Sequence, residues 1–572
     1  MSPADPSAAG PQGLDRFAAR ITAALGPLLE VDPASLQLER PRNEEHGEFA
    51  LPCFRFAKDG EKPPALAARL AGTLEVADVE ASAVGPFLNF RIASGAMAAA
   101  VLEDAARADF AGGASGATTI VEFSSPNIAK PMHVGHMRTT VIGAALARIH
   151  EHLGHEVIRI NHLGDWGAQF GKLVAAWRRW GDEDALTAAP IEHLLELYVR
   201  FHREEETDES LAAEAKAAFR ELESGEDNDT RATWLRFTGE SLKEFQKVYD
   251  RFGISFDYLR GESWYEDKLE PLLAWLDDCG VTEESDGATI VDLESEGIKT
   301  PCLVKTAHGT TLYATRDLAA ARSRWEEFAF DQALYVVGAE QTLHFQQFFA
   351  VLRRCGAEWA DRLEHVPFGL IRLTEGKLST RAGRVIALHE VLDRAVELAR
   401  AAVDEKNPEL QGKEQVAEMV GVGAVVFHDL KHQRQKDVVF DWKEVLSFEG
   451  DTGPYLQYTY ARCGSILRKA DAAPDREAFD PALVAEESRE LCVALGRLPQ
   501  ALREAAQKRE PMVLAQALLR LGAAGNVYYR ENRVLGLDDP ALGNARLVVI
   551  DTLRRALSLG LGLLGVPCPE EM

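Results

Sequence analysis

The fold class is decided by the segment Thr118-Thr-Ile-Val-Glu-Phe-Ser124, which runs directly into Ser125-Pro-Asn-Ile-Ala-Lys-Pro-Met-His133-Val-Gly-His136. The first run predicts a buried β-strand, and Met137–Leu153 has the apolar spacing of an amphipathic helix. A strand, a tight turn and a helix place the helix N-terminus at the carboxyl edge of a sheet, where open α/β sheets bind ligands. Because free N–H groups and the positive helix end attract anions, the segment predicts a phosphate site.

His133 and His136 lie three residues apart, on one face at the start of this helix. Gly135 between them lets a nucleotide approach the backbone closely. Two imidazoles in this place can donate hydrogen bonds to phosphoryl oxygens that gain charge in a transition state. A bare pair of histidines with this spacing is more often a metal site or an ordinary surface pair, so the pair alone leaves the function open.

Outward from this segment, the 572 residues allow three or four domains at roughly 150 residues each. Strand runs at Val157–Asn161, Ala333–Val337 and His365–Leu373 alternate with helical runs, which predicts a parallel sheet of βαβ units. The expected organisation is a disordered tail (1–14), a mixed N-terminal domain (15–108), the α/β domain (109–385) with a helical insertion at about 172–250, and a helical domain (386–572). Within the N-terminal domain, Pro64–Leu74 predicts a helix and Phe87–Ile92 a strand.

Composition narrows the function classes. Without 18 uninterrupted apolar residues or an N-terminal secretory leader, the chain is expected to be cytoplasmic and not membrane-bound. Seven scattered cysteines with no C-x-x-C pair predict neither a disulfide framework nor a zinc site. The net charge of −27 argues against nucleic-acid binding, although phosphate contact needs only a local basic stripe. The basic run Lys431–Lys436 is either such a stripe or an ordinary exposed helix face.

The twelve residues Ser125–His136 resemble the HIGH signature of class I aminoacyl-tRNA synthetases, in the form that arginyl-tRNA synthetases carry. Val134 stands where the signature has isoleucine. Later, Gly376-Lys377-Leu-Ser379-Thr-Arg381 resembles the KMSKS loop, with Thr380 in place of the second lysine. The resemblance implies a multidomain α/β protein: a doubly wound, parallel Rossmann-like catalytic domain, an N-terminal α+β add-on domain and a C-terminal all-α anticodon-binding bundle.

The implied activity is that of an arginine–tRNA ligase, which activates L-arginine with ATP and transfers it to the 3′ end of tRNA(Arg). Mg²⁺ is expected on the ATP phosphates, with no metal bound by the protein itself, no obligate protein partner and a monomeric chain. Lys130 is predicted to supply the charge that Thr380 lacks, with Arg381 as the second candidate. The resemblance assigns catalysis and ATP binding to these residues: Lys130, His133, Gly135, His136, Lys377, Ser379 and Arg381.

Recognition of arginine requires a carboxylate and planar acceptors for the guanidinium fork. Polar residues near the predicted strand ends suit this, although each also suits a helix cap or a surface ion pair. By resemblance, Asp317 and Tyr313 hold the guanidinium with help from Glu122, and Asn127 and Gln341 hold the α-amino end. His133 is assigned to the arginine site as well. The segment Glu262–Tyr265 also resembles a family segment near the site, and no role is assigned to it.

Contacts with tRNA are expected at both ends of the chain. Gly85–Phe90 resembles the domain that meets the tRNA elbow, where Phe87 and Asn89 suit stacking and edge bonding to an unpaired base. Phe448–Arg462 resembles the start of the anticodon-binding bundle, whose aromatic and guanidinium groups suit stacking of splayed bases. The candidates there are Tyr455, Tyr458, Arg462, Tyr528, Tyr529 and Met572. For these residues, the alternative to tRNA contact is packing within a buried strand or between helices.

For the chain as a whole, the alternatives are a non-catalytic tRNA-binding relative or another class I enzyme such as a cysteinyl one.

Overall fold

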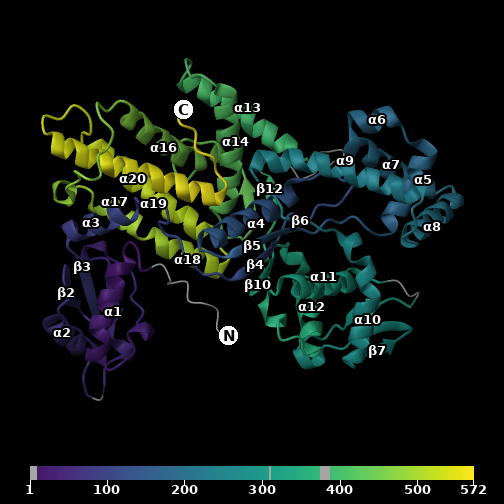
Figure 1. Cartoon of the computed structure of the whole chain (residues 1–572), viewed down its shortest axis with the longest axis horizontal. Coiled ribbons are helices and arrows are strands. Elements are labelled where there is room, and N and C mark those ends of the chain that lie inside the picture. The colour runs from purple at the N-terminus through teal and green to yellow at the C-terminus, as the bar shows by residue number, and fades with distance from the viewer. Residues whose placement is uncertain (1–9, 59, 308–310, 374–386) are drawn as a thin grey trace.

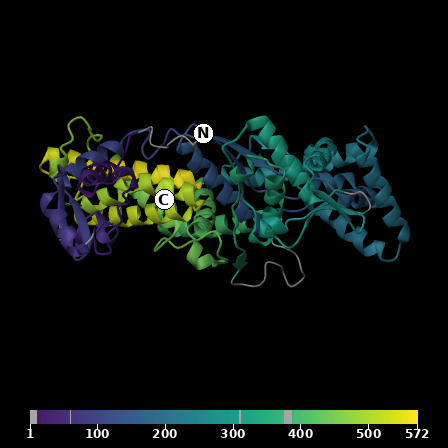
Figure 2. The ribbon, with the colours of Figure 1, turned by 90° about the horizontal axis from the view of Figure 1, so that it is seen from below.

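The protein is elongated, with its domains arranged along the long axis (Figure 1). The computed structural model describes residues 10–58, 60–307, 311–373 and 387–572. The N-terminal domain and the C-terminal bundle lie side by side at one end, and the helical insertion forms the other end. The same order along the axis is visible in the perpendicular view (Figure 2), with the α/β domain in the middle.

A five-stranded parallel sheet in the order β11-β10-β4-β5-β6 forms the centre of the α/β domain. Its strands are β4 (Thr118–Glu122), β5 (Glu156–Asn161), β6 (Tyr258–Leu259), β10 (Gln332–Tyr335) and β11 (Leu363–His365). The chain builds outward from β4 to β6, then returns to the other side of β4 with β10 and β11. The switch in direction therefore lies next to β4, and a doubly wound sheet binds its ligands at that point. The α/β fold with its parallel sheet is confirmed.

Helix α4 (Val134–His152) follows β4, as the first segment predicts. A Cβ atom on Gly143 would lie 2.2 Å from Cβ of Phe123, so this glycine allows α4 to pack closely on the end of its own strand. Helix α4 also buries Arg138 almost completely, with its Nε 2.8 Å from Oδ1 of the equally buried Asp429 on α14. The helix that begins at the phosphate site is thus locked to the C-terminal bundle.

The run His365–Leu373 is not one strand, contrary to the prediction. Strand β11 ends at His365, and the separate β12 (Ile371–Leu373) pairs in parallel with β13 (Val438–Phe440). Pro367 has no N–H for a ladder, and the backbone of Lys436 lies where a Cβ on Gly369 would be. The region 386–572, expected to be wholly helical, therefore contains one strand in its described part.

The insertion between β5 and β6 is helical, as expected, and its buried apolar side chains join the large core that includes α4 and the C-terminal bundle. Its helices are α5 (Ala168–Trp180), α6 (Glu183–Ala188), α7 (Pro190–Glu205), α8 (Glu209–Glu223) and α9 (Asp229–Phe252). After β6 the chain forms α10 (Leu269–Asp278), a small antiparallel sheet of β7 (Thr282–Ser285), β8 (Ala288–Val291) and β9 (Cys302–Lys305), and then α11 (Tyr313–Phe328) and α12 (Thr342–Arg354). Helices α11 and α12 border the carboxyl edge of the central sheet through their first turns.

The N-terminal domain is an antiparallel sheet in the order β1-β3-β2 with three helices. Its elements are α1 (Asp15–Leu29), β1 (Phe49–Pro52), α2 (Pro63–Thr73), β2 (Val79–Val84), β3 (Phe87–Ile92) and α3 (Ser94–Asp104). The expected tail 1–14 is too long, because Gln12 is buried and its Oε1 accepts a hydrogen bond of 2.7 Å from the backbone of Ala111. Leu14 is buried as well, and its N–H bonds Gly496 in the C-terminal bundle.

The C-terminal bundle packs on α4 and on the N-terminal domain. Its helices are α13 (Leu388–Lys406), α14 (Lys413–Leu430), α15 (Trp442–Val445), α16 (Gly453–Arg468), α17 (Arg489–Gly496), α18 (Leu498–Lys508), α19 (Met512–Glu531) and α20 (Pro540–Leu564). Arg489 at the start of α17 bonds the backbone oxygen of Ile92 and the hydroxyl of Ser94, and pairs with the buried Glu48. A buried charge of this kind binds the N-terminal domain firmly to the bundle.

Candidate active site

The start of α4 is capped by its own histidines. The Nδ1 atom of His133 accepts the N–H of Gly135 at 3.0 Å, and Nδ1 of His136 accepts the N–H of His133 at 3.1 Å. Burial lowers the pKa of His136 to about 3, so its ring is neutral and carries its proton on Nε2. The two rings lie 4.0 Å apart, and each keeps an Nε2–H donor for an incoming oxygen. The donors offered to a phosphate are thus side chains, because the backbone N–H groups of His133 and Gly135 are already used.

Gly135 is required by this cap. A Cβ atom at that position would lie 2.7 Å from Cε1 and 2.8 Å from Nδ1 of His133. Any larger residue would push the imidazole off the helix end and free its hydrogen bond. Glycine at position 135 therefore serves two purposes. It lets a nucleotide approach the backbone, as the sequence suggests, and it leaves room for the imidazole of His133.

The turn between β4 and α4 holds three non-glycine residues in the left-handed region: Ser124 (φ 75°), Ser125 (φ 49°) and Ala129 (φ 61°). Strained backbone of this kind clusters at ligand-binding sites. The buried hydroxyl of Ser241 on α9 accepts the N–H of Ala129, so the insertion supports the turn. Lys130, the next residue, is half-buried with its Nζ 5.5 Å from the ring centre of Tyr198 on α7.

A carboxylate at the start of α11 is surrounded by imidazoles and other carboxyl groups. Oδ2 of Asp317 lies 2.5 Å from Nε2 of His344 on α12, and Oδ1 lies 3.9 Å from Nε2 of His162 after β5. Four residues earlier, Tyr313 is 67% exposed on the same helix face. Asp317 and Tyr313, predicted together from their spacing, are therefore both available to a ligand at the sheet edge.

Glu122, at the carboxyl end of β4, is already paired inside the protein. Its Oε2 lies 2.5 Å from Nη1 of the fully buried Arg324, whose other arm is 3.5 Å from Nδ1 of His162. A continuous polar chain thus runs from Glu122 through Arg324 and His162 to Asp317. Of the two residues predicted for the α-amino end, Asn127 and Gln341 are both exposed in loops that follow β4 and β10.

Glu262 is a site residue to which the sequence argument gave no role. It follows β6, and burial raises its pKa to about 8, with Arg316 lowering it and Asp317 and Asp165 raising it again. Asp165 is itself buried and accepts hydrogen bonds from the N–H and hydroxyl of Ser263. The only sequence signal was the resemblance of Glu262–Tyr265 to a family segment, without an indication of what Glu262 faces. The edge of the sheet therefore gathers carboxyl groups from three separate parts of the chain, which suits a cationic ligand.

The second predicted motif lies outside the described residues. Lys377, Ser379, Thr380 and Arg381 all fall within 374–386. Strand β12 ends at Leu373, directly before this segment, and α13 begins at Leu388 directly after it. No group of three or more His, Cys, Asp or Glu side chains suited to a metal ion occurs in the ranges that the structure describes.

Family comparisons cover the chain from end to end. The family described as tRNA synthetases class I (R), catalytic domain, matches residues 100–442, the arginyl tRNA synthetase N terminal domain matches 15–92, and the DALR anticodon binding domain matches 456–572. The arginine–tRNA ligase of an Exiguobacterium species is 44% identical over 566 residues, which cover 97% of this chain and 99% of that protein. The chain belongs to the arginyl-tRNA synthetase family.

Further relatives agree with this assignment. The arginine–tRNA ligase 1 of Bacillus cereus is 43% identical over 546 residues, covering 94% of this chain and 95% of that protein. The solved Thermus thermophilus arginyl-tRNA synthetase superposes with a TM-score of 0.82 at 29% identity, over 97% of this chain and all of that one. The three-domain architecture expected from the sequence is confirmed.

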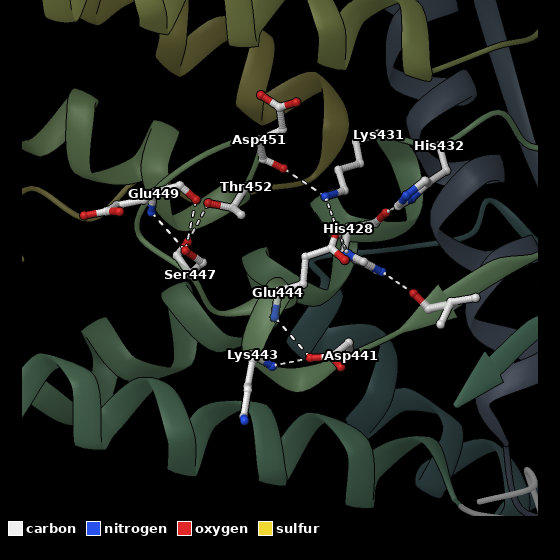
Figure 3. Close-up of polar contacts among 11 residues, drawn as sticks. His428, Lys431, His432, Asp441, Lys443, Glu444, Ser447, Glu449, Asp451 and Thr452 are labelled. Atoms are coloured by element: carbon white, nitrogen blue, oxygen red, sulfur yellow. Dashed lines mark hydrogen bonds and ion pairs between the residues drawn. The ribbon is translucent and has the colours of Figure 1, made fainter. Parts of the chain in front are cut away.

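The start of α16, where the match to the DALR anticodon binding domain begins, is held by a polar loop (Figure 3). Thr452 caps α16 by accepting the N–H of Tyr455, and its hydroxyl donates to Ser447 O. Lys431 at the end of α14 donates to Glu444 at 2.7 Å and to the backbone oxygen of Asp451 at 3.0 Å. Lys431 is therefore a structural cation, and the first residue of the basic run Lys431–Lys436 does not belong to a free basic stripe.

The predicted aromatic face of α16 is present at the surface. Tyr458 is 38% exposed, and Arg462, also exposed, lies over the ring of Tyr529 on α19 at 4.9 Å. Tyr455 is half-buried and accepts a hydrogen bond from Asn526. The half-buried C-terminal residue Met572 accepts a bond from Asn407 through its backbone oxygen, next to the end of α13.

Two of the predicted tRNA contacts are not exposed. Tyr528 is 2% exposed and donates its hydroxyl proton to Glu487, because it lies on the face of α19 that packs against α17. Asn89 is also 2% exposed, since β3 is the central strand of its sheet, and its Nδ2 has no hydrogen-bond partner among the described residues. Phe87, at the start of the same strand, is exposed and packs edge-on against the exposed Phe54.

Proposed function

We infer that this chain is an arginine–tRNA ligase: it activates L-arginine with ATP, releases pyrophosphate, and transfers the arginyl group to the 3′-terminal adenosine of tRNA(Arg). The observation that carries the inference is the cluster of carboxyl groups around Asp317, at the same sheet edge as the histidine cap of α4. An anion-binding helix start beside a cation-binding pocket suits the union of ATP with arginine.

The chemistry needs no covalent nucleophile from the protein. The carboxylate of arginine attacks the α-phosphorus of ATP, pyrophosphate leaves, and arginyl-adenylate forms. A hydroxyl of the terminal adenosine then attacks the carbonyl carbon, and AMP leaves. The protein positions the reactants and stabilises charge, and Nε2–H of His133 and His136 donate to oxygens of the phosphoryl group. Mg²⁺ enters on the phosphates of ATP and neutralises the charge that develops there.

The arginine substrate is placed by its two cationic ends. The guanidinium is held by Asp317, Tyr313 and Glu262. Glu122 supports this side of the site through its ion pair with Arg324. The α-amino group is held by Asn127 and Gln341. Lys130 and the 374–386 segment, with Lys377, Ser379 and Arg381, complete the phosphate site. Phe87 meets the tRNA elbow, and the Tyr455–Tyr458–Arg462 face with Tyr529 and Met572 meets the anticodon.

We also place the protein in the cytoplasm, where tRNA is charged, as a monomer without an obligate protein partner. Within the described ranges, every helix is too short or too polar to cross a membrane.

The test is exchange of labelled pyrophosphate into ATP by the purified chain. Exchange is expected only when arginine and tRNA are both present with ATP, because tRNA dependence of the first step is the expectation for this family. Tight tRNA binding without exchange or arginyl-tRNA formation would identify a non-catalytic relative. Omitting arginine, and replacing it with lysine, serve as controls for the amino-acid site.

A further inference from the structure

His344 forms a hydrogen bond with Asp317, the residue whose carboxylate is expected to hold the substrate. Its Nε2 lies 2.5 Å from Oδ2 of Asp317, and 25% of the His344 side chain and 27% of the Asp317 side chain are exposed to solvent. The imidazole packs edge-on against the ring of Phe345, and that ring stacks on His365 of β11 with 4.3 Å between the ring centres. Asp317 therefore already has a hydrogen-bond donor before arginine arrives.

The two histidines beside Asp317 are not equivalent. Nδ1 of His162 lies 3.5 Å from the guanidinium of Arg324 and accepts from it, so Nε2 of the same ring carries a proton and faces Asp317. Among the residues that the structure describes, no such cation is recorded against His344. Burial lowers the pKa of His344, but the hydrogen bond and charge of Asp317 outweigh burial and raise the pKa above its usual value. The imidazolium of His344, paired with Asp317, therefore persists to a higher pH than that of an ordinary histidine.

A guanidinium that binds Asp317 competes with this imidazolium. Two cations would then share one carboxylate in a partly buried pocket, where like charges within a few ångströms repel strongly. The arrangement can relax by loss of one proton from His344, which leaves a neutral Nε2–H donor that still orients Asp317. Arginine itself loses no proton in this range, because its guanidinium stays charged and its α-amino group titrates at higher pH.

We propose that arginine binding expels a proton from His344, and that His344 is a positioning residue which couples arginine affinity to pH through Asp317. The inference rests on the proposed function and deepens it. Below the pKa of His344 in the free protein, the KM for arginine is expected to fall about tenfold for each pH unit gained. Above that pKa His344 is expected to add no further pH dependence to the KM, whereas Glu262 and the α-amino group of arginine titrate near pH 8.

Other titratable groups around this pair must be separated from it. They are His162 after β5, Glu262 after β6, His365 on β11 and Glu340 before α12. Glu262 is the main competitor, because its pKa of about 8 means that an incoming cation also drives a proton from it. Because Glu262 is protonated below about pH 8, it can release a proton at pH 6.5 as well, and the Glu262→Gln variant separates that proton from the proton of His344.

The experiment is calorimetric titration of arginine into the full chain with tRNA(Arg) present, in two buffers of different ionisation enthalpy. The difference in heat gives the number of protons released. At pH 6.5, His344→Gln, which keeps an amide donor for Asp317 but cannot titrate, is expected to release up to one proton fewer than the wild type. Glu262→Gln is expected to retain the His344 proton at this pH. His152→Gln, at the far end of α4 on the backbone oxygen of Phe110, serves as the matched control and is expected to behave as the wild type.

The KM for arginine gives a second readout. His344→Gln and His344→Asn are both expected to show a shallower fall of the KM with rising pH than the wild type, whereas His344→Ala is expected to raise the KM at every pH because Asp317 loses its donor. Unchanged proton release and an unchanged slope in His344→Gln would overturn this inference while arginine still binds. Absence of any arginine binding by the wild type would instead overturn the proposed function.

Discussion

Asp429→Asn is the most informative perturbation of the fold around the site, because it removes one charge from a pair that is sealed between two domains. Arg138 and Asp429 are each 1% exposed, with Nε and Oδ1 2.8 Å apart. The change keeps the side-chain volume, so its effect reports charge and not packing. It leaves the guanidinium of Arg138 buried without a counter-ion, although the backbone oxygens of Gly369 at 2.7 Å and Lys436 at 2.9 Å still accept from it.

Breaking one side of a buried ion pair costs about 3–5 kcal/mol, since the remaining charge has no compensation. We therefore expect Asp429→Asn to destabilise the contact of α4 with α14 by that amount. The double variant Arg138→Met/Asp429→Leu is expected to lose less than Asp429→Asn alone, because neither charge remains buried. A positive coupling energy of about 2 kcal/mol or more is expected from the full double-mutant cycle.

The assay is native-state hydrogen exchange followed along α4 and α14, because a chain with three domains does not unfold in one two-state step. Amides at the start of α4, next to the histidine cap, are expected to lose protection together with those near Asp429. A loss of less than about 1 kcal/mol in Asp429→Asn would refute the reasoning, as would a double variant whose loss equals the sum of the single variants.

Three further predictions concern the ligands. Asp317→Asn is expected to raise the KM for arginine by more than about tenfold, or about 1.4 kcal/mol, and a smaller rise in steady-state kinetics would remove Asp317 from the guanidinium site. Lys130→Ala is expected to slow pyrophosphate exchange by well over a few-fold, and a rate close to the wild type would assign the missing charge elsewhere. Tyr458→Ala is expected to weaken tRNA binding by about 1–3 kcal/mol in a filter-binding assay, for the loss of one stacked base, whereas Tyr528→Phe is expected to leave binding unchanged because Tyr528 is buried.

Local pattern was sufficient wherever neighbours in sequence are neighbours in space. The strand, turn and helix from Thr118 to Leu153 were predictable because β4 and α4 are adjacent and each has its own apolar period. Tyr313 and Asp317 were predictable as a pair for the same reason, since they are one helical turn apart on α11. The family resemblance then added the arginine and tRNA roles, which no periodicity could have supplied.

Long-range partners were not predictable from pattern. The contacts of Asp317 with His344 and His162 join three separate segments of the sheet edge, and no spacing in the sequence relates them. Strand β12 was merged with β11 because its partner β13 lies far along the chain, in a region whose other described elements are helices. The exposures of Asn89 and Tyr528 were misjudged because the elements that cover them cannot be inferred from the motifs that contain them.

The central claim, that this chain selects arginine by its guanidinium charge and joins it to tRNA, is tested most directly by comparing arginine with citrulline in aminoacylation of tRNA(Arg). The two differ by replacement of the guanidinium with a neutral urea group, so citrulline would leave the carboxylate of Asp317 in the pocket without its cation. We predict kcat/KM for citrulline lower by at least about 10⁴, as expected for a site built around a polar group that the analogue lacks. Comparable values for the two amino acids, or no arginyl-tRNA from arginine itself, would contradict the account.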